Sequence, residues 1–77
     1  MTESTTDREE LHRRAHAAVK RQADIRELRA WIEGRVAERK ERGDEPWPHD
    51  VEFLRTTQPI MDWLEAEIAE VARLLHG

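Results

Sequence analysis

Apolar and small residues recur three and four positions apart from residue 7 to residue 42, which is the spacing of one face of an α-helix. No proline interrupts this stretch, and Gly34 is its one glycine. The pattern predicts a single helix over residues 7–42, about 50 Å long at ~1.5 Å per residue. We call this face, and its counterpart in the second half of the chain, the seam. In the first half, polar residues hold three seam positions, Gln22, Arg29 and Arg39, and the others are Leu11, Ala15, Ala18, Ile25, Ile32 and Val36.

A break follows at residues 43–49, where Gly43 suits the C-cap of a helix and the prolines Pro46 and Pro48 prevent its continuation. Asp50 is suited to cap a second helix, which we predict over residues 50–76. The spacing in this second helix is more regular and more apolar than in the first. Its seam positions are Leu54, Thr57, Met61, Leu64, Ile68, Val71 and Leu75.

Pro59 lies inside the second predicted helix, on the side opposite the seam. A proline removes a backbone hydrogen bond and bends or breaks a helix. Because the seam spacing continues on both sides of Pro59, we favour one bent helix, or two abutting pieces, over a loop.

Two helices joined by a short connection predict an all-α antiparallel helical hairpin. It forms a single domain over residues 7–77, preceded by a disordered tail at residues 1–6. A chain of 77 residues buries a limited share of its surface, and two helices leave one side of each seam uncovered. We therefore expect the hairpin to dimerise into a four-helix bundle. The residues expected in the core and in self-association are Leu54, Met61, Leu64, Ile68, Val71, Leu75, Ile25 and Ile32.

The composition excludes several classes of protein. There is no cysteine, so neither disulfides nor thiolate metal sites stabilise the chain. Apolar residues make up 38% and charged residues 39%, and no apolar run is long enough for a membrane span. The first residues lack the basic and apolar segments of a signal peptide, so a cytoplasmic protein without a membrane partner is expected.

Charge is distributed unevenly. Residues 8–42 hold eleven Lys and Arg against seven Asp and Glu, whereas residues 43–77 hold two against eight. One interpretation is that the two halves pack together and neutralise each other. The other is that the basic half binds an external polyanion, which the acidic half would oppose.

Nucleic-acid binding is the alternative function, because the first helix is rich in arginine. Carboxylates are interleaved with these arginines, which is more typical of a solvated helix surface than of one basic stripe. The arginines in question are Arg13, Arg14, Arg21, Arg26, Arg29, Arg35, Arg39 and Arg42.

Neither catalysis nor a cofactor is indicated. The chain has no Cys, no Tyr and no glycine-rich phosphate loop, and two helices do not enclose a substrate pocket. His12 and His16 have the four-residue spacing of metal ligands on a helix, and His76 lies near them in a hairpin centred on residue 46. Whether these three bind a metal stays open, since exposed histidines near helix ends have the same spacing.

The three tryptophans carry nearly all of the aromatic content. Trp31 and Trp63 fall on the outer flanks of their seams, and a hairpin that turns near Trp47 places them at the same height. They either widen the seam within one chain or form an apolar patch that another protein covers. Trp47, held between two prolines, and Leu28, which flanks the seam, complete the predicted partner-binding residues.

The sequence therefore predicts a non-catalytic protein–protein interaction module, an adaptor, regulator or assembly factor. The expected partner is a second copy, another protein, or both. The alternative is a small dimeric regulator that binds nucleic acid through the arginine-rich helix.

Overall fold

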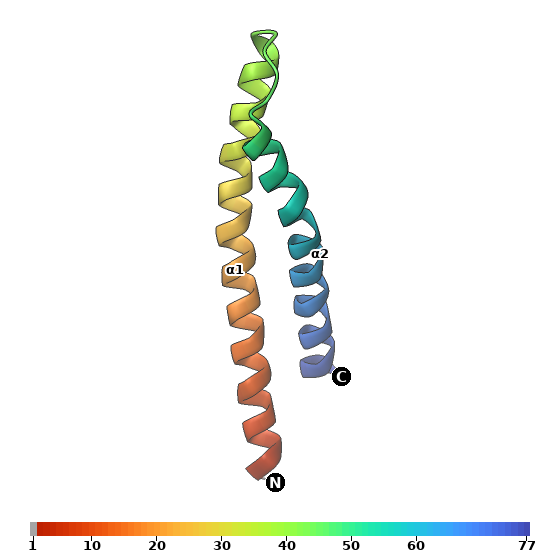
Figure 1. Ribbon diagram of the computed structural model, residues 1–77. Coiled ribbons are helices and arrows are strands. Elements are labelled where there is room, and N and C mark those ends of the chain that lie inside the picture. The colour runs from red at the N-terminus through yellow and green to blue at the C-terminus, as the bar shows by residue number, and fades with distance from the viewer. Residues whose placement is uncertain (1) are drawn as a thin grey trace.

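The computed structural model describes the backbone of residues 2–77 and the side chains of residues 7–77. Its two helices are α1, Thr2–Glu41, and α2, Pro48–His76, which lie side by side and antiparallel (Figure 1). They form a narrow hairpin of 63 × 17 × 15 Å, and the described residues contain no β-strand. The predicted all-α hairpin is confirmed. The predicted disorder of residues 1–6 falls outside the residues described with their side chains.

The end of α1 is a Schellman motif centred on Gly43. Gly43 has a φ of 79°, in the left-handed region that glycine adopts without steric cost. Its N–H donates to the Lys40 carbonyl at 3.0 Å, and the Asp44 N–H donates to the Arg39 carbonyl at 2.9 Å. These bonds satisfy the last carbonyls of α1, so Gly43 ends the helix as the sequence predicts.

The start of α2 differs from the prediction by two residues. The helix begins at Pro48, with Trp47 as an N-cap residue in extended conformation that makes no side-chain capping bond. Proline suits the first helical position, because its φ is already helical and its missing N–H is not needed there. Asp50 therefore lies inside the first turn, where its carboxylate is 2% exposed and faces Arg35.

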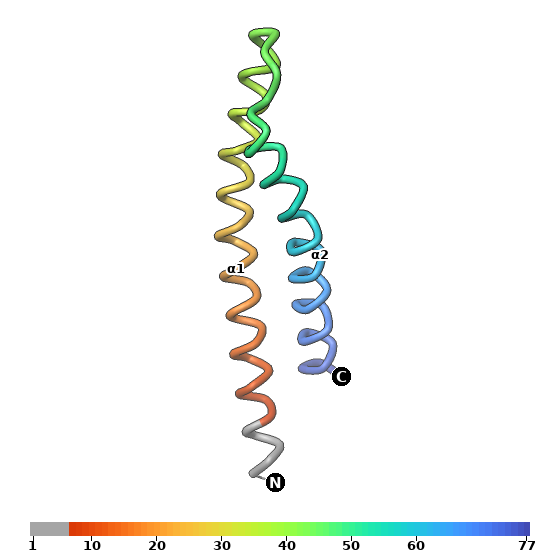
Figure 2. Tube along the Cα trace, in the orientation of Figure 1, coloured from red at the N-terminus to blue at the C-terminus, as the bar shows by residue number. Residues whose placement is uncertain are grey.

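Pro59 bends α2 without breaking it, which is one of the two alternatives favoured from the sequence over a loop. The helix runs through Pro59, which is exposed. In Figures 1 and 2, α2 starts against α1, runs obliquely away from it over its first turns and then continues alongside it, so the bend is convex away from α1. The Thr57 hydroxyl donates to the Phe53 carbonyl at 2.6 Å, a back-bond of the kind that favours helix bending.

The core is a narrow strip between the two helices. Among residues 7–77, the buried apolar side chains are Ala18, Leu64 and Val71, and Leu64 and Val71 are at most 2% exposed. Both sit on the predicted seam, whose other apolar members are half-buried: Leu54, Met61, Ile68, Leu75, Leu11, Ala15, Ile25, Ile32 and Val36. Over the residues described, neither helix contains a stretch that is apolar enough to span a bilayer.

The register of the hairpin follows from contacts between the helices. These contacts are Arg14 with Glu67, Arg29 with Thr57, and Arg35 with Asp50. The midpoints of these pairs lie near residues 40–43, so the chain reverses direction at Gly43 and not at Trp47. The connection then runs back along the end of α1, where Arg39 Nε donates to the Glu45 carbonyl at 2.6 Å.

Candidate protein-interaction face

A groove lies beside Trp63, between α2 and the middle of α1. Its floor includes Ala17 and Ala18, whose small side chains leave space next to the indole ring. Arg14 and Arg21 line the α1 side, and the other lining residues are Leu64 and Glu67. We call this the Trp63 groove. It combines an apolar floor with two guanidinium groups from the same helix.

A second hollow lies further along α1 and is acidic. It is lined by Asp24, Glu27, Leu28 and Trp31. Leu28 is 54% exposed and Trp31 is 63% exposed, so both present apolar surface to solvent. The Arg35 guanidinium lies 5.0 Å from the centre of the Trp31 ring and covers part of one ring face. We call this the Trp31 hollow.

The Trp63 groove and the Trp31 hollow open on the same side of the hairpin. Residues seven apart in an α-helix lie within ~20° of one another around the axis. Ala17, Asp24 and Trp31 have this spacing, and so do Arg14, Arg21 and Leu28. One side of α1 therefore contributes to both depressions.

The side of α2 that carries Trp63 extends this surface. Ile60 is three residues before Trp63 and Leu74 is eleven after it, so both point the same way as the indole. Both are exposed, and Trp63 itself is 62% exposed. We call this side of the hairpin the lateral face. Its exposed large apolar residues are Leu28, Trp31, Ile60, Trp63 and Leu74.

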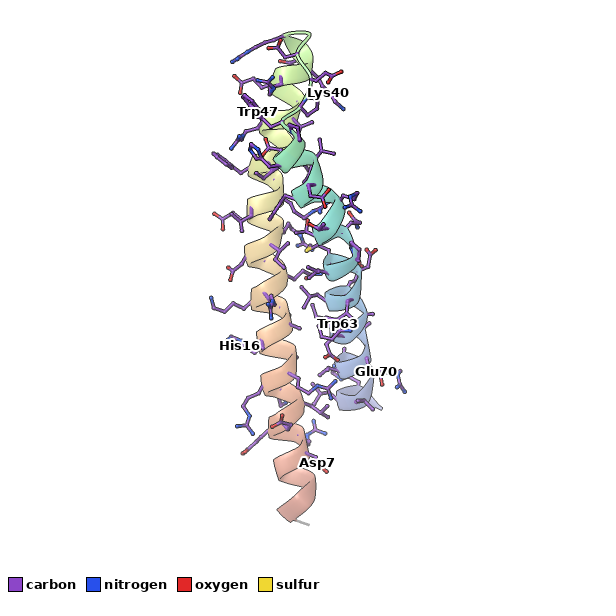
Figure 3. The ribbon with its side chains drawn as sticks, in the orientation of Figure 1. Asp7, His16, Lys40, Trp47, Trp63 and Glu70 are labelled. Carbon is purple, nitrogen blue, oxygen red and sulfur yellow. The ribbon has the colours of Figure 1, made fainter. Side chains whose placement is uncertain are left out.

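The expectation that Trp31 and Trp63 stand at one height is wrong. Trp63 lies beside Ala17 and Ala18, and Figure 3 shows it level with His16. Trp31 is fourteen residues beyond Ala17 on α1, which is about 21 Å along the helix axis at ~1.5 Å per residue. The error arises from the turn, because reversal at Gly43 shifts the register of the hairpin. The two indoles share a side of the molecule but belong to separate depressions.

Trp47 is held at the connection between the helices. The Arg39 guanidinium lies 4.1 Å from the centre of its ring, and the ring stacks on His49 with centroids 6.1 Å apart. Arg39 also binds the Glu45 carbonyl, so one side chain ties the connection to α1 at two points. These contacts give Trp47 a role within the chain that the sequence did not reveal.

A polar cluster lies inside the seam around Arg29, whose side chain is 14% exposed. Its guanidinium donates to the Leu54 carbonyl at 2.8 Å, to the Thr57 hydroxyl and to Gln58 Oε1 at 2.9 Å. In the sequence, Arg29 interrupts the apolar spacing, and only its seam position indicates that it faces α2. We call these four residues the Arg29 cluster.

An ion pair between half-buried Arg35 and buried Asp50 joins the helices nearer the turn. Arg35 Nε lies 3.2 Å from Asp50 Oδ2, an oxygen that has no hydrogen-bond partner among the described residues. His49 Nε2 lies 3.4 Å from the other Asp50 oxygen. The pair is thus held by charge without a directed hydrogen bond, and it sets Asp50 against α1.

Most of the arginines proposed as a nucleic-acid surface have carboxylate partners. Four arginines of α1, and Arg42 directly after it, form ion pairs: Arg13 with Glu10, Arg14 with Glu67, Arg29 with Glu33, Arg35 with Asp50, and Arg42 with Glu38. On α2, the hydrogen bond and the charge of Glu52 raise the pKa of Arg55 above its ordinary value. Half of the arginines of α1 are therefore matched by a carboxylate partner.

The structure does not gather the histidines into a metal site. Among residues 7–77, no group of three His, Asp or Glu side chains is placed to hold a metal ion. Comparisons with known proteins supply no further indication, since no family model, curated protein or solved structure matches this chain.

Proposed function

We propose that this protein is a non-catalytic protein–protein interaction module that works through the lateral face and self-associates there into a four-helix arrangement. The observation that carries the proposal is the concentration of exposed Leu28, Trp31, Ile60, Trp63 and Leu74 on one side of a two-helix hairpin. Large exposed apolar side chains that gather on one face are typical of surfaces that a partner covers.

Two further features support an association module. The hairpin is 15 Å thick in its narrowest dimension, so no third layer covers the half-buried seam residues. Tryptophan is enriched at positions that dominate binding energy in protein interfaces. Covering the lateral face would remove apolar surface from water at about 25 cal/mol per Å².

Nucleic-acid binding receives less support from the same geometry. Four of the eight arginines of α1 already form ion pairs with carboxylates. Binding to nucleic acid would have to displace these contacts and bring the phosphates close to the acidic α2.

The test compares wild type with Trp31→Ala, Trp63→Ala and Val19→Ala by sedimentation equilibrium and circular dichroism. Val19 is an exposed apolar residue two positions from Ala17, so it points to the opposite side of α1 and serves as the matched control. We expect wild type and the Val19 variant to exceed the 9.1 kDa monomer mass at micromolar concentration. Each Trp variant should keep its helicity while association weakens at least tenfold, about 1.4 kcal/mol.

A wild-type mass of 9.1 kDa over the whole concentration range would refute self-association. Unfolding of either Trp variant would assign that indole to the core instead of the interface. An electrophoretic mobility shift with nonspecific DNA at low salt tests the alternative, and a strong salt-sensitive shift would favour it.

A further inference from the structure

The lateral face presents two depressions of opposite character, and this arrangement is self-complementary. The Trp63 groove offers an apolar floor flanked by Arg21 and by Arg14, whose guanidinium pairs with Glu67 within the chain. The Trp31 hollow offers an aromatic ring and Leu28 beside the carboxylates of Asp24 and Glu27. The carboxylates of the Trp31 hollow can thus pair with guanidinium groups of the Trp63 groove.

Resting on the proposed function, we infer that the lateral face is occupied by a second copy of this chain lying antiparallel across it. In this dimer the Trp31 hollow of each copy docks on the Trp63 groove of the other. A two-fold axis perpendicular to α1 brings both pairs of depressions together at once, because a symmetric interface repeats each contact.

The spacing along α1 places this axis at Asp24. Ala17 and Trp31 are each seven residues from Asp24 along the helix. Arg21 and Glu27 are each three residues from it. The same axis therefore sets Trp31 over the small side chain of Ala17 in the second copy, and sets Glu27 against Arg21. A parallel arrangement would instead place the Trp63 groove of one copy on the Trp63 groove of the other and bring like charges together.

The charges at these positions are available for contacts between copies. Among residues 7–77, neither Arg21 nor Glu27 takes part in an ion pair within the chain. At the axis, Asp24 of one copy faces Asp24 of the other, and the two carboxylates repel. Lys20 Nζ lies 3.7 Å from the Asp24 carboxylate within each chain and offsets part of this repulsion.

The area of the face fits a modest dimer. From Arg14 to Arg35 it extends about 30 Å along α1 at ~1.5 Å per residue, and the hairpin is 17 Å wide. This gives roughly 500 Å² in projection per copy, near the lower end of specific interfaces, which bury about 600–1,000 Å² per partner. We therefore expect association in the micromolar range.

A charge-exchange experiment tests this register. Arg21→Glu and Glu27→Arg are prepared separately, and each is measured alone and in equimolar mixture by sedimentation equilibrium. In the homodimer of either variant, positions 21 and 27 carry like charges and face each other at both symmetric sites. Association should therefore weaken at least tenfold. In the mixture, the glutamate introduced at position 21 of one chain meets the arginine introduced at position 27 of the other. The native pair of Glu27 with Arg21 forms at the second site, so the mixture should recover association close to that of wild type.

Two further variants sharpen the result. Arg26→Glu makes the same change of charge on the opposite side of α1 from the lateral face, since Arg26 is nine residues from Ala17. It should leave association unchanged. Asp24→Asn removes the like-charge contact at the axis and should tighten association about two- to fivefold. Both glutamate and arginine favour helix, and circular dichroism checks that each variant is folded.

The outcomes separate this inference from the proposed function. A dimeric wild type whose Arg21→Glu and Glu27→Arg mixture shows no recovery, or whose Asp24→Asn variant associates more weakly, would overturn the antiparallel register and leave the interaction module standing. A wild type that stays monomeric would overturn both. Recovery in the mixture together with tightening by Asp24→Asn would establish the second copy as the occupant of the lateral face.

Discussion

Replacing Arg29 with alanine should destabilise the hairpin more than any other single arginine replacement on α1. Arg29 is the arginine that donates to three acceptors on α2, namely the Leu54 carbonyl, the Thr57 hydroxyl and the Gln58 side chain. Arginine is suited to this position because its planar guanidinium presents several N–H groups in fixed directions. Its aliphatic stem also packs in the seam.

The expected magnitude follows from the burial of each contact. Hydrogen bonds to a charged group contribute about 1.5–3 kcal/mol each, but Gln58 is exposed and Thr57 keeps its bond to the Phe53 carbonyl. The cost of desolvating the guanidinium offsets part of the remainder. A net loss of about 1–3 kcal/mol results, which corresponds to roughly 5–20 °C in Tm for a domain of this size.

The assay is thermal unfolding followed by circular dichroism at fixed protein concentration, for wild type, Arg29→Ala, Arg29→Lys and Arg26→Ala. Arg26 is exposed and forms no ion pair among residues 7–77, so it controls for helix propensity and net charge. Lysine keeps the charge but not the guanidinium geometry, so Arg29→Lys should fall between wild type and Arg29→Ala. Equal Tm values for Arg29→Ala and Arg26→Ala would refute the reasoning, and equal values for Arg29→Lys and wild type would show that only the charge matters.

Three other predictions concern the core, the turn and charge. Leu64→Ala should cost about 2–5 kcal/mol by chemical denaturation, whereas the same change at exposed Leu74 should cost far less, and equal losses would place the core elsewhere. Gly43→Ala should cost about 1–2 kcal/mol through its positive φ alone, because a Cβ there meets no atom within 4 Å; an unchanged Tm would show that the turn relaxes. Raising NaCl should lower Tm by a few degrees, since salt screens cross-helix pairs such as Arg14 with Glu67, and a rise would show that repulsion between like charges dominates.

Local features of the sequence determine most of the fold. The 3–4 spacing identifies the inward face of each helix, and Leu64 and Val71 lie buried on it. Gly43 ends α1 because only a residue that tolerates positive φ completes the Schellman motif without strain. The continuity of the spacing across Pro59 indicates a bend, since proline on the outer side of a helix leaves the inner side packed.

The tertiary structure decides the register of the hairpin and the partners of its polar seam residues. Chain reversal occurs at Gly43, and the segment after it runs extended along α1, where Trp47 meets Arg39. An extended residue advances about 3.3 Å and a helical one about 1.5 Å, so a short extended segment spans several residues of the facing helix. This offset puts Trp63 beside Ala17 and not opposite Trp31. Spacing within each helix is a local property that the sequence displays, whereas the offset between two helices depends on the path of the turn and on the contacts that form across it.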